Sequence, residues 1–272
     1  MIKPTHITTT LLVACLVSSG YAASISVNIS PNATVDNQRV DAGETAFNGI
    51  ADAESVDGSN WNNLSLGTGA VGNMSIWPTL TQGGNHVDLT DSSGIDSGVN
   101  LTSSGSFYSN YANASTPNQG ATGDGGLMQG YINLNSSETI SLSGLAAWAP
   151  NGYKVVAAFD IGPLTRTYGV SMNDGGPTQI FWTADTAGAD SDTNNDGVIG
   201  WIETTATTSG TAVSDANYAI YGTFTGDTLT ISGDAVSGRG TLNGFQIIAV
   251  PEPSSTALLG LGGLALILRR RK

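Results

Sequence analysis

Cysteine is almost absent from this sequence: Cys15 is the only one in 272 residues. It lies in an N-terminal segment in which Lys3 precedes a short apolar run and small residues stand at Gly20 and Ala22. This order is typical of a secretory signal peptide, which we predict to span residues 1–22. Because cleavage after Ala22 removes Cys15, the mature chain is predicted to fold without disulfide bonds.

One alternative for the N-terminal segment stays open. The tetrapeptide Leu12-Val13-Ala14-Cys15 is similar to a lipobox, in which the cysteine becomes the lipidated first residue of a lipoprotein. Three threonines before it leave fewer apolar residues than the roughly 7–15 of a usual hydrophobic region. We therefore favour ordinary cleavage after Ala22.

Basic residues are also scarce, with nine lysines and arginines against 22 aspartates and glutamates. Those that lie between the two terminal segments are Arg39, Lys154, Arg166 and Arg239, against 21 acidic residues. Affinity for nucleic acid and for anionic lipid depends on clustered cations. The composition therefore excludes nucleic acid as a partner, and the acidic surface suits solubility and divalent cations.

Lysine, glutamate and leucine are sparse in the mature region, whereas glycine, threonine, serine and asparagine are abundant, with 36 glycines in the whole chain. This composition disfavours helix and predicts an all-β ectodomain over residues 23–249. Residues 24–30 alternate apolar and polar side chains, as a half-buried strand does. Residues 31–72 are predicted to be irregular, anchored by Trp61 and Leu64.

Turns rich in Asn, Gly, Asp and Pro separate the other expected strands, and such regular short strands predict a sandwich or barrel. We expect these strands at residues 74–80, 86–89, 99–108, 131–134, 139–145, 153–161, 167–172, 179–184, 198–204, 218–224, 228–232 and 242–250.

The C-terminal tail has three parts in order. The first is Pro251-Glu252-Pro253, which fixes two φ angles and removes two backbone donors, so neither a strand nor a helix runs through it. The second, residues 256–268, is free of charge and suits a single helix in lipid, although it is short for the roughly 30 Å hydrocarbon core. The third is a cytoplasmic stop of Arg269, Arg270, Arg271 and Lys272.

This tail, residues 250–272, resembles the PEP-CTERM sorting signal of Gram-negative bacteria. The resemblance implies recognition by exosortase, a membrane transpeptidase that cuts near Pro-Glu-Pro after the general secretion machinery has exported the chain. It also implies transient anchoring in the inner membrane by a C-terminal transmembrane helix, followed by transfer to the cell surface or the extracellular matrix. An uncleaved tail anchor is the alternative.

Two stretches of the ectodomain, SETISLSGLAAWAPNGYKVVAAFDIG and NYAIYGTFTGDTLTISGDAVSGRGTLNGFQIIAV, resemble galactose-binding-like jelly-roll domains. The resemblance covers residues 137–250 and rests on a GYKVV strand and a final LNGFQI strand. It implies a jelly-roll-like β-sandwich, and many domains of this shape bind carbohydrate, although a fold alone does not decide a function.

Residues 192–203 fit the calcium-loop pattern D-x-[DN]-x-[DN]-G-x5-E at every specified position. The pattern supplies hard oxygen ligands, which calcium prefers. The expected ligands are the side chains of Asp192, Asn194, Asp196 and Glu203 and the carbonyl of Val198. Because the flanking segments are predicted to be strands and not helices, a plain acidic turn at Asn195-Asp196-Gly197 stays open.

Taken together, these patterns predict a non-catalytic, carbohydrate-binding protein of the bacterial envelope or extracellular matrix. Trp61, Trp77, Trp148, Trp182 and Trp201 supply either a platform for stacking sugars or core side chains. One alternative is a glycan-degrading hydrolase or lyase that uses two carboxylates, since many acidic pairs exist. The other is a purely structural matrix protein.

Overall fold

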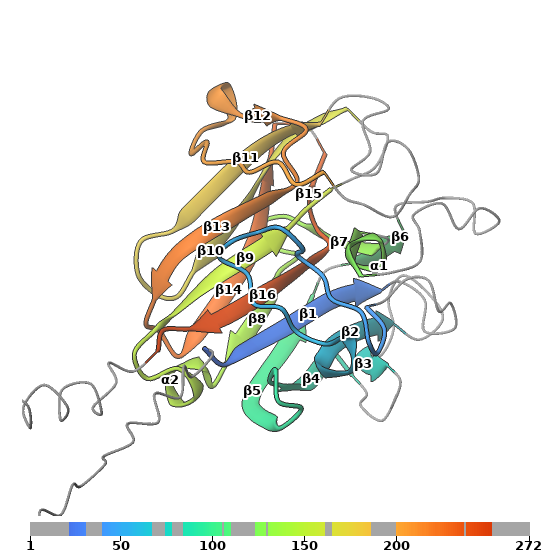
Figure 1. Ribbon diagram of the computed structural model, residues 1–272. Helices are drawn as coiled ribbons and strands as arrows, with labels where there is room; N and C mark the ends of the chain where they lie inside the picture. The colour runs from blue at the N-terminus through green and yellow to red at the C-terminus, as the bar shows by residue number, and fades with distance from the viewer. Residues whose placement is uncertain are drawn as a thin grey trace, which may run out of the picture. The chain divides into compact units, whose positions relative to one another are not determined.

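Two β-sheets of the computed structural model face each other across an apolar core (Figure 1). The structure describes residues 22–30, 40–66, 74–77, 84–104, 106–109, 123–128, 130–160, 165–185, 200–236 and 238–251. Residues Ala22–Val250 form one compact unit. The described part of this unit consists of strands with a few short helical turns, so the prediction of an all-β sandwich is confirmed.

The six-stranded sheet has the order β13-β9-β16-β1-β2-β3, and its neighbours are antiparallel except for the parallel pair β1 and β2. Its strands are β1 (Ser24–Ser30), β2 (Trp61–Leu66), β3 (Met74–Trp77), β9 (Tyr153–Ala158), β13 (Tyr218–Phe224) and β16 (Gly244–Ala249). The first and last strands of the unit are thus direct neighbours, with Ser24 opposite Ile248.

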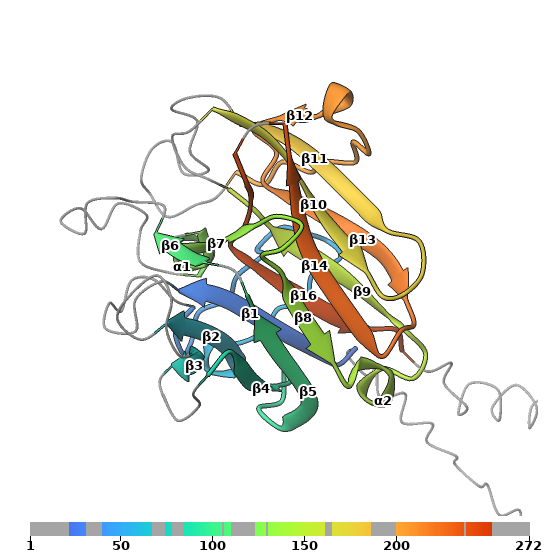
Figure 2. The same cartoon turned by 180° about the vertical axis from the view of Figure 1, so that it is seen from behind.

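The seven-stranded sheet lies behind the six-stranded one and faces the viewer in Figure 2. Its strands, in spatial order, are β12 (Val213–Ser214), β11 (Gln179–Asp185), β10 (Arg166–Asn173), β14 (Thr228–Ala235), β8 (Ile140–Ser143), β5 (Asp96–Ser103) and β4 (His86–Thr90). A three-stranded sheet is formed by β15 (Gly240–Leu242), β7 (Gly130–Leu134) and β6 (Ser106–Ser109). The α-helices are α1 (Asp124–Met128) and α2 (Leu145–Trp148).

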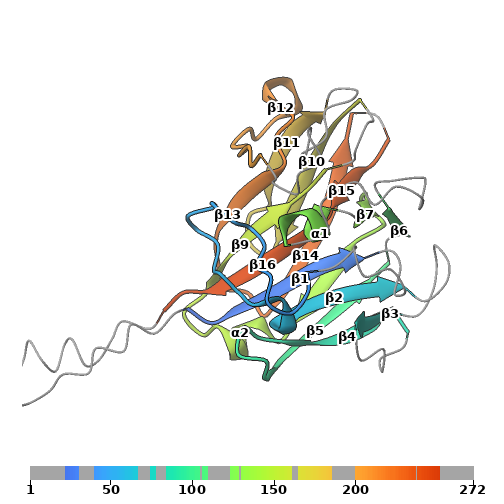
Figure 3. The ribbon, with the colours of Figure 1, turned by 45° about the vertical axis from the view of Figure 1, so that its right-hand side comes forward.

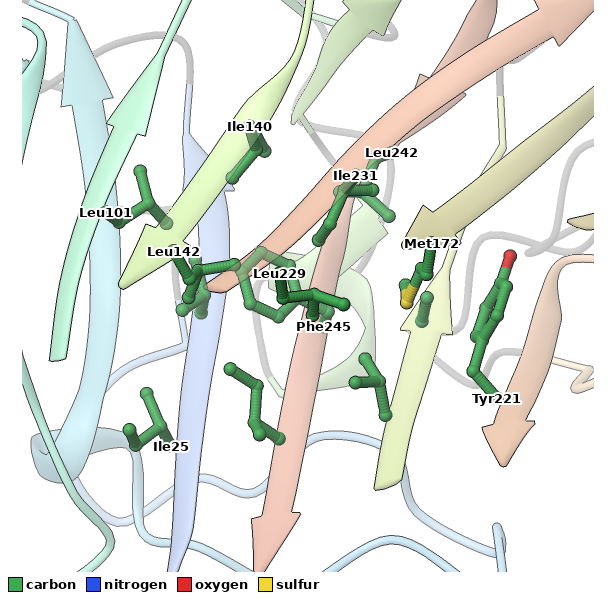
Figure 4. Packing of buried hydrophobic residues seen from close by; sticks show 14 of the residues in the cluster. Ile25, Leu101, Ile140, Leu142, Met172, Tyr221, Leu229, Ile231, Leu242 and Phe245 are labelled. Atoms are coloured by element: carbon green, nitrogen blue, oxygen red, sulfur yellow. The ribbon is translucent and has the colours of Figure 1, made fainter. Parts of the chain in front are cut away.

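The core between the sheets is built from every second residue of each strand, because successive side chains of a strand point to opposite faces. Figure 4 shows Phe245 of the six-stranded sheet beside Leu142 and Leu229 of the seven-stranded one, and Tyr221 beside Met172. Each fully buried Leu, Ile or Phe contributes about 1.5–3 kcal/mol. This burial is the main favourable term that holds the sheets together.

Strand β1 departs from the sequence prediction. Its alternating pattern predicts one polar face in water, yet all seven residues are buried. The reason is that segment 40–60 crosses the outer face of the six-stranded sheet, in front of β16 and β1 in Figure 1. The prediction of a half-buried strand is therefore wrong, and the polar side chains of β1 face other protein groups and not solvent.

Side-chain amides attach segment 40–60 to that outer face. Asn63 Oδ1 accepts from the Val40 N–H at 3.0 Å, and Asn63 Nδ2 donates to the Val40 carbonyl at 3.0 Å. Gln246 Oε1 accepts from the Glu54 N–H at 2.6 Å, and its Nε2 donates to the Glu54 carbonyl at 2.9 Å. Each amide thus satisfies both backbone groups of one loop residue, as a neighbouring strand would.

A third amide uses the same arrangement between the two sheets. Asn62 Oδ1 accepts from the Thr90 N–H at 2.9 Å, and Asn62 Nδ2 donates to the Thr90 carbonyl at 2.8 Å. Asn62 belongs to β2 of the six-stranded sheet and Thr90 to β4 of the seven-stranded one. The edge of the sandwich at these strands is therefore joined by hydrogen bonds as well as by apolar contact (Figure 3).

Several expected strands differ from those of the structure. The range 99–108 is split into β5, in the seven-stranded sheet, and β6, in the three-stranded one. The range 242–250 is likewise split between β15 and β16. Within 198–204, the described residues from 200 onward form no strand, and Glu203 makes an isolated bridge to Tyr218. Alternation shows which residues favour strand, but not where the chain leaves one sheet for another.

The sequence does not predict strand β2, which lies in the range 31–72 expected to be irregular. Its sequence WNNLSL has two adjacent asparagines, which are depleted in strands. Their side chains are used here to bind Val40 and Thr90, so tertiary hydrogen bonds outweigh the local preference. Trp61 and Leu64 are buried, as anchors should be.

We expect Asn63→Ala to destabilise the protein by about 2 kcal/mol or more, because two buried backbone groups of Val40 lose their partners at about 1–3 kcal/mol each. Chemical denaturation of the variant and the parent chain measures this difference. The control is Asn151→Ala, at an exposed turn residue, with an expected change within about 0.5 kcal/mol. Equal effects at both positions would contradict the role given to Asn63.

Candidate functional site

A second apolar cluster covers the outer face of the six-stranded sheet. It is formed by Val40, Ala46, Phe47, Ile50, Val56, Trp61, Leu127, Met128, Val156, Ala158 and Ile248. Trp201, Tyr218 and Ile220 are partly buried and pack against it. Segment 40–60, α1 and residues 200–206 therefore meet over this sheet, and aromatic and acidic side chains gather where they meet.

Four aromatic rings form a continuous row from the interior to the surface. The centroid of Phe47 lies 6.0 Å from that of Trp61 and 5.5 Å from that of Trp201. Trp201 in turn lies 5.9 Å from Tyr218, with the two rings edge to face at 87°. Trp61 and Phe47 are buried, so they hold the partly exposed rings of Trp201 and Tyr218 in fixed positions.

The backbone of Phe47 adopts a positive φ of 60°. Residues other than glycine, and bulky ones in particular, are uncommon in this left-handed region. Such strain persists only where the surrounding structure imposes it, and it is concentrated at functional positions. Here it places the Phe47 ring between Trp61 and Trp201.

Charged side chains surround the exposed end of the row. The Tyr218 hydroxyl donates to Glu203 Oε2 at 3.4 Å, and Lys154 Nζ lies 2.6 Å from Asp52 Oδ1. Partial burial, followed by the negative charges of Glu203 and Asp52, raises the pKa of Tyr218. We call Trp201, Tyr218, Glu203, Asp52 and Lys154 the aromatic-acidic patch.

Asp124, the first residue of α1, is a buried carboxylate beneath this patch. The backbone N–H of Asn48 donates to its Oδ1 at 3.1 Å, and Asn48 Nδ2 donates to its Oδ2 at 3.2 Å. Burial raises the pKa of Asp124, although these bonds and the nearby Trp201 indole favour the charged form. The Trp201 indole nitrogen is itself buried, with no partner in hydrogen-bonding geometry among the described residues.

Sequence reasoning missed Asp124 because its partner is distant along the chain. Asn48 and Asp124 are 76 positions apart, and neither lies in a range expected to form a strand. No local pattern marks such a pair. The sequence offers Trp201 as one of five tryptophans for sugar stacking, but nothing in it predicts that Tyr218 and Phe47 lie beside this ring.

The five tryptophans do not form one exposed platform. Trp61 and Trp182 are buried, which confirms the core interpretation for these two. Trp148 is partly exposed and lies elsewhere, in α2, and Trp77 belongs to β3. Among the tryptophans whose burial the structure describes, Trp201 is the one that lies beside another partly exposed ring, Tyr218, which in turn contacts a carboxylate.

The predicted calcium loop lies mostly outside the described residues, since Asp192, Asn194, Asp196 and Val198 all fall in the range 186–199. Glu203, its last expected ligand, is exposed and accepts from Tyr218. Within the described ranges, no three side chains of His, Cys, Asp and Glu are grouped closely enough to hold a metal ion. The calcium loop therefore stays a prediction.

Of the sorting tail, residues 250–272, the structure describes Val250 and Pro251. Pro251 is exposed, and the preceding Val250 N–H donates to the Gly152 carbonyl at 2.8 Å. Glu252, Pro253 and the cluster Arg269, Arg270 and Arg271 lie outside the described residues, as does the expected transmembrane helix. Among the residues that are described, no helix is both long and apolar enough to cross a membrane.

A comparison with known protein families matches residues 249–272 to the PEP-CTERM protein-sorting motif. The C-terminal tail is a PEP-CTERM sorting motif. The match agrees with the tail boundaries expected from the sequence to within one residue. Comparisons with curated proteins and with solved structures find no match to the chain.

The raised pKa of Asp124 predicts a pH-dependent stability difference between the parent chain and Asp124→Asn. Above the ordinary value of 3.8, the unfolded state releases this proton while the folded state retains it. The parent chain should therefore lose stability, relative to the variant, as the pH rises from about 3.8 through the folded pKa.

Melting temperatures of the two proteins across this range measure the effect. Asp234→Asn, at an exposed carboxylate, is the control, because it shows how the loss of one negative charge alone changes the melting temperature. A constant difference between Asp124→Asn and the parent chain at every pH would contradict the assignment.

Proposed function

We propose that this chain is an exported, surface-sorted protein that binds carbohydrate without cleaving it. The PEP-CTERM motif implies export and surface sorting, and it makes exosortase the expected processing partner. Carbohydrate binding is our further step, and it is supported by the aromatic-acidic patch. The ectodomain would then act at the cell surface or in the extracellular matrix.

The observation that carries carbohydrate binding is the fixed pair of partly exposed rings, Trp201 and Tyr218, beside Glu203. A sugar ring has an apolar face, which packs on an aromatic side chain, and hydroxyl groups that need hydrogen-bond partners. Glu203 accepts such bonds, and Lys154 and Asp52 extend the polar border. The buried Phe47 fixes the Trp201 ring, which lowers the entropic cost of binding.

The alternative is a glycan-degrading enzyme, and one observation favours it. Asp124 has a raised pKa, as a general acid requires, and lies close to Trp201 in the same region as Glu203. Against this alternative, Asp124 is buried and both its oxygens accept from Asn48. Such a carboxylate is occupied in holding segment 40–60 to α1, so we favour binding over cleavage.

We also propose that the sandwich is jelly-roll-like. The support is the way the chain alternates between its two large sheets: β8 is in the seven-stranded sheet, β9 in the six-stranded, β10 and β11 in the seven-stranded, and β13 in the six-stranded. Strands β14 and β16 continue this alternation. Repeated crossing between two mainly antiparallel sheets is the arrangement that jelly rolls use to bury their faces.

We expect Trp201→Ala to abolish retention of the protein on a glycan array, because the ring that stacks on the sugar is lost. Glu203→Gln should weaken retention at least tenfold. Because this variant keeps both rings, the test stays informative if Trp201→Ala does not fold. Trp148→Ala, in α2 outside the patch, is the matched control and should bind as the parent chain does.

Unchanged binding in both patch variants would place any glycan site elsewhere. Shortening of a polysaccharide by the parent chain, lost in Asp124→Asn, would instead identify the enzyme alternative.

Replacing Pro251, Glu252 and Pro253 together by alanine should prevent sorting, because the stiff break that exosortase recognises becomes continuous with its neighbours. In a host that has exosortase, we expect the variant to stay unprocessed in the inner-membrane fraction while the parent chain reaches the surface. Cell fractionation with immunoblotting measures both. Replacing Ser254 and Ser255 by alanine is the control, and equal processing of all three proteins would contradict this role for the motif.

A further inference from the structure

The backbone that carries Trp201 and Glu203 is held against β13, an edge strand of the six-stranded sheet. Asn217, the residue before β13, is buried. Its Oδ1 accepts from the Ile202 N–H at 2.8 Å, and its Nδ2 donates to the Gly200 carbonyl at 2.9 Å. Its own backbone N–H donates to the Ile202 carbonyl at 3.0 Å. Trp201 and Glu203 therefore project from a fixed backbone, which lowers the entropic cost of binding a ligand there.

The Glu203 carboxylate is exposed and has no cationic partner among the described residues. Within the described ranges, lysine and arginine are represented by Lys154, Arg166 and Arg239. Lys154 is bound to Asp52 at 2.6 Å, and none of the three forms an ion pair with Glu203. The aromatic-acidic patch thus sets two carboxylates against one ammonium, and its excess charge is negative.

This carboxylate lies at the border of the two partly exposed rings. The Tyr218 hydroxyl donates to Glu203 Oε2 at 3.4 Å, and the Tyr218 ring meets Trp201 edge to face at 5.9 Å. Carboxylate oxygens only accept hydrogen bonds, and the phenolic oxygen of Tyr218 can accept one as well. The faces of Trp and Tyr rings also attract cations. The site therefore favours a ligand that presents a positively charged donor beside an apolar ring face.

We propose that the glycan bound at the aromatic-acidic patch is cationic and contains amino sugars with free amines, of the glucosamine type. The ammonium group binds Glu203 while the sugar ring stacks on Trp201. An ammonium brings three donors and a charge, and charge-assisted hydrogen bonds are roughly twice as strong as neutral ones. The sugar class adds to the carbohydrate binding proposed above and depends on it.

Other classes of sugar fit the charge of the patch less well. A neutral sugar offers hydroxyl donors alone, so it leaves the charge of Glu203 unbalanced. An acidic sugar would bring its own carboxylate toward Glu203 and Asp52, and like charges placed together oppose binding. The formal net charge of the chain, −13, repels an anionic polymer at longer range as well.

Calorimetric titration of the full-length chain with two matched oligosaccharides tests the proposal. The probes are the glucosamine tetramer and the N-acetylglucosamine tetramer, which differ in whether the nitrogen carries a charge. In mildly acidic buffer, where the amines are protonated, the parent chain should bind the free-amine tetramer about tenfold more tightly or better. Added salt should reduce this preference, because charges at the surface are screened.

Glu203→Gln keeps the size and the hydrogen-bonding capacity of the side chain and removes its charge, so the ratio of the two affinities should fall to about one. Asp234→Asn is the matched control, because it removes one exposed carboxylate outside the patch. It should keep the ratio of the parent chain. Trp201→Ala should lose both tetramers, since stacking on this ring is common to them.

The outcomes separate the sugar class from the proposed function. Equal affinity of the parent chain for the two tetramers, or tighter binding of the acetylated one, would overturn the sugar class and leave carbohydrate binding in place. A preference that Glu203→Gln retains, or that Asp234→Asn also loses, would overturn it too, because the selectivity would come from the whole acidic surface. Retention of other glycans without either tetramer has the same meaning. Absence of binding to any glycan would overturn both.

Discussion

The architecture depends on side-chain amides that bind backbone groups in the way that a neighbouring strand would. Asn62, Asn63 and Gln246 each bind both the N–H and the carbonyl of one residue in a separate segment. A chain with a single cysteine, Cys15, cannot fasten its long irregular segments with internal disulfide bonds. Paired hydrogen bonds provide that attachment here, and they satisfy backbone groups that would otherwise be buried at high cost.

The aromatic-acidic patch exists because segment 40–60 is held in this way. That segment carries Phe47, which orients Trp201, and Asn48, which binds Asp124 of α1. Loss of the attachment at Val40 or Glu54 would free both residues together. The exposed surface and the amide contacts on the outer face of the six-stranded sheet are therefore parts of one cooperative unit, although Asn63 and Gln246 lie outside the patch itself.

The sequence predicts those features that depend on short stretches of chain. Alternation alone places β1 and β13 within their observed bounds, and the terminal Pro-Glu-Pro with its arginines is recognisable without a structure. Features that depend on contacts between distant segments of the chain are not predictable from the sequence in this way. The burial of both faces of β1, the strand at Trp61–Leu66 and the contact of Asn48 with Asp124 each require a segment far along the chain. The calcium pattern at residues 192–203 is visible in the sequence, but most of it lies outside the described residues, so its geometry stays a prediction.

The position of β16 has a consequence for the order of events during export. This last strand lies inside the six-stranded sheet between β9 and β1, and the Ala249 N–H donates to the Ala23 carbonyl at 2.9 Å. The sheet cannot close until residues 244–249 have been delivered, so a partly translocated chain lacks the strand that joins its two halves. Completion of the six-stranded sheet therefore has to wait until residues 244–249 have been exported. The sorting motif begins at the last residue of this strand, so the segment that completes the sheet and the segment that carries the sorting signal adjoin along the chain.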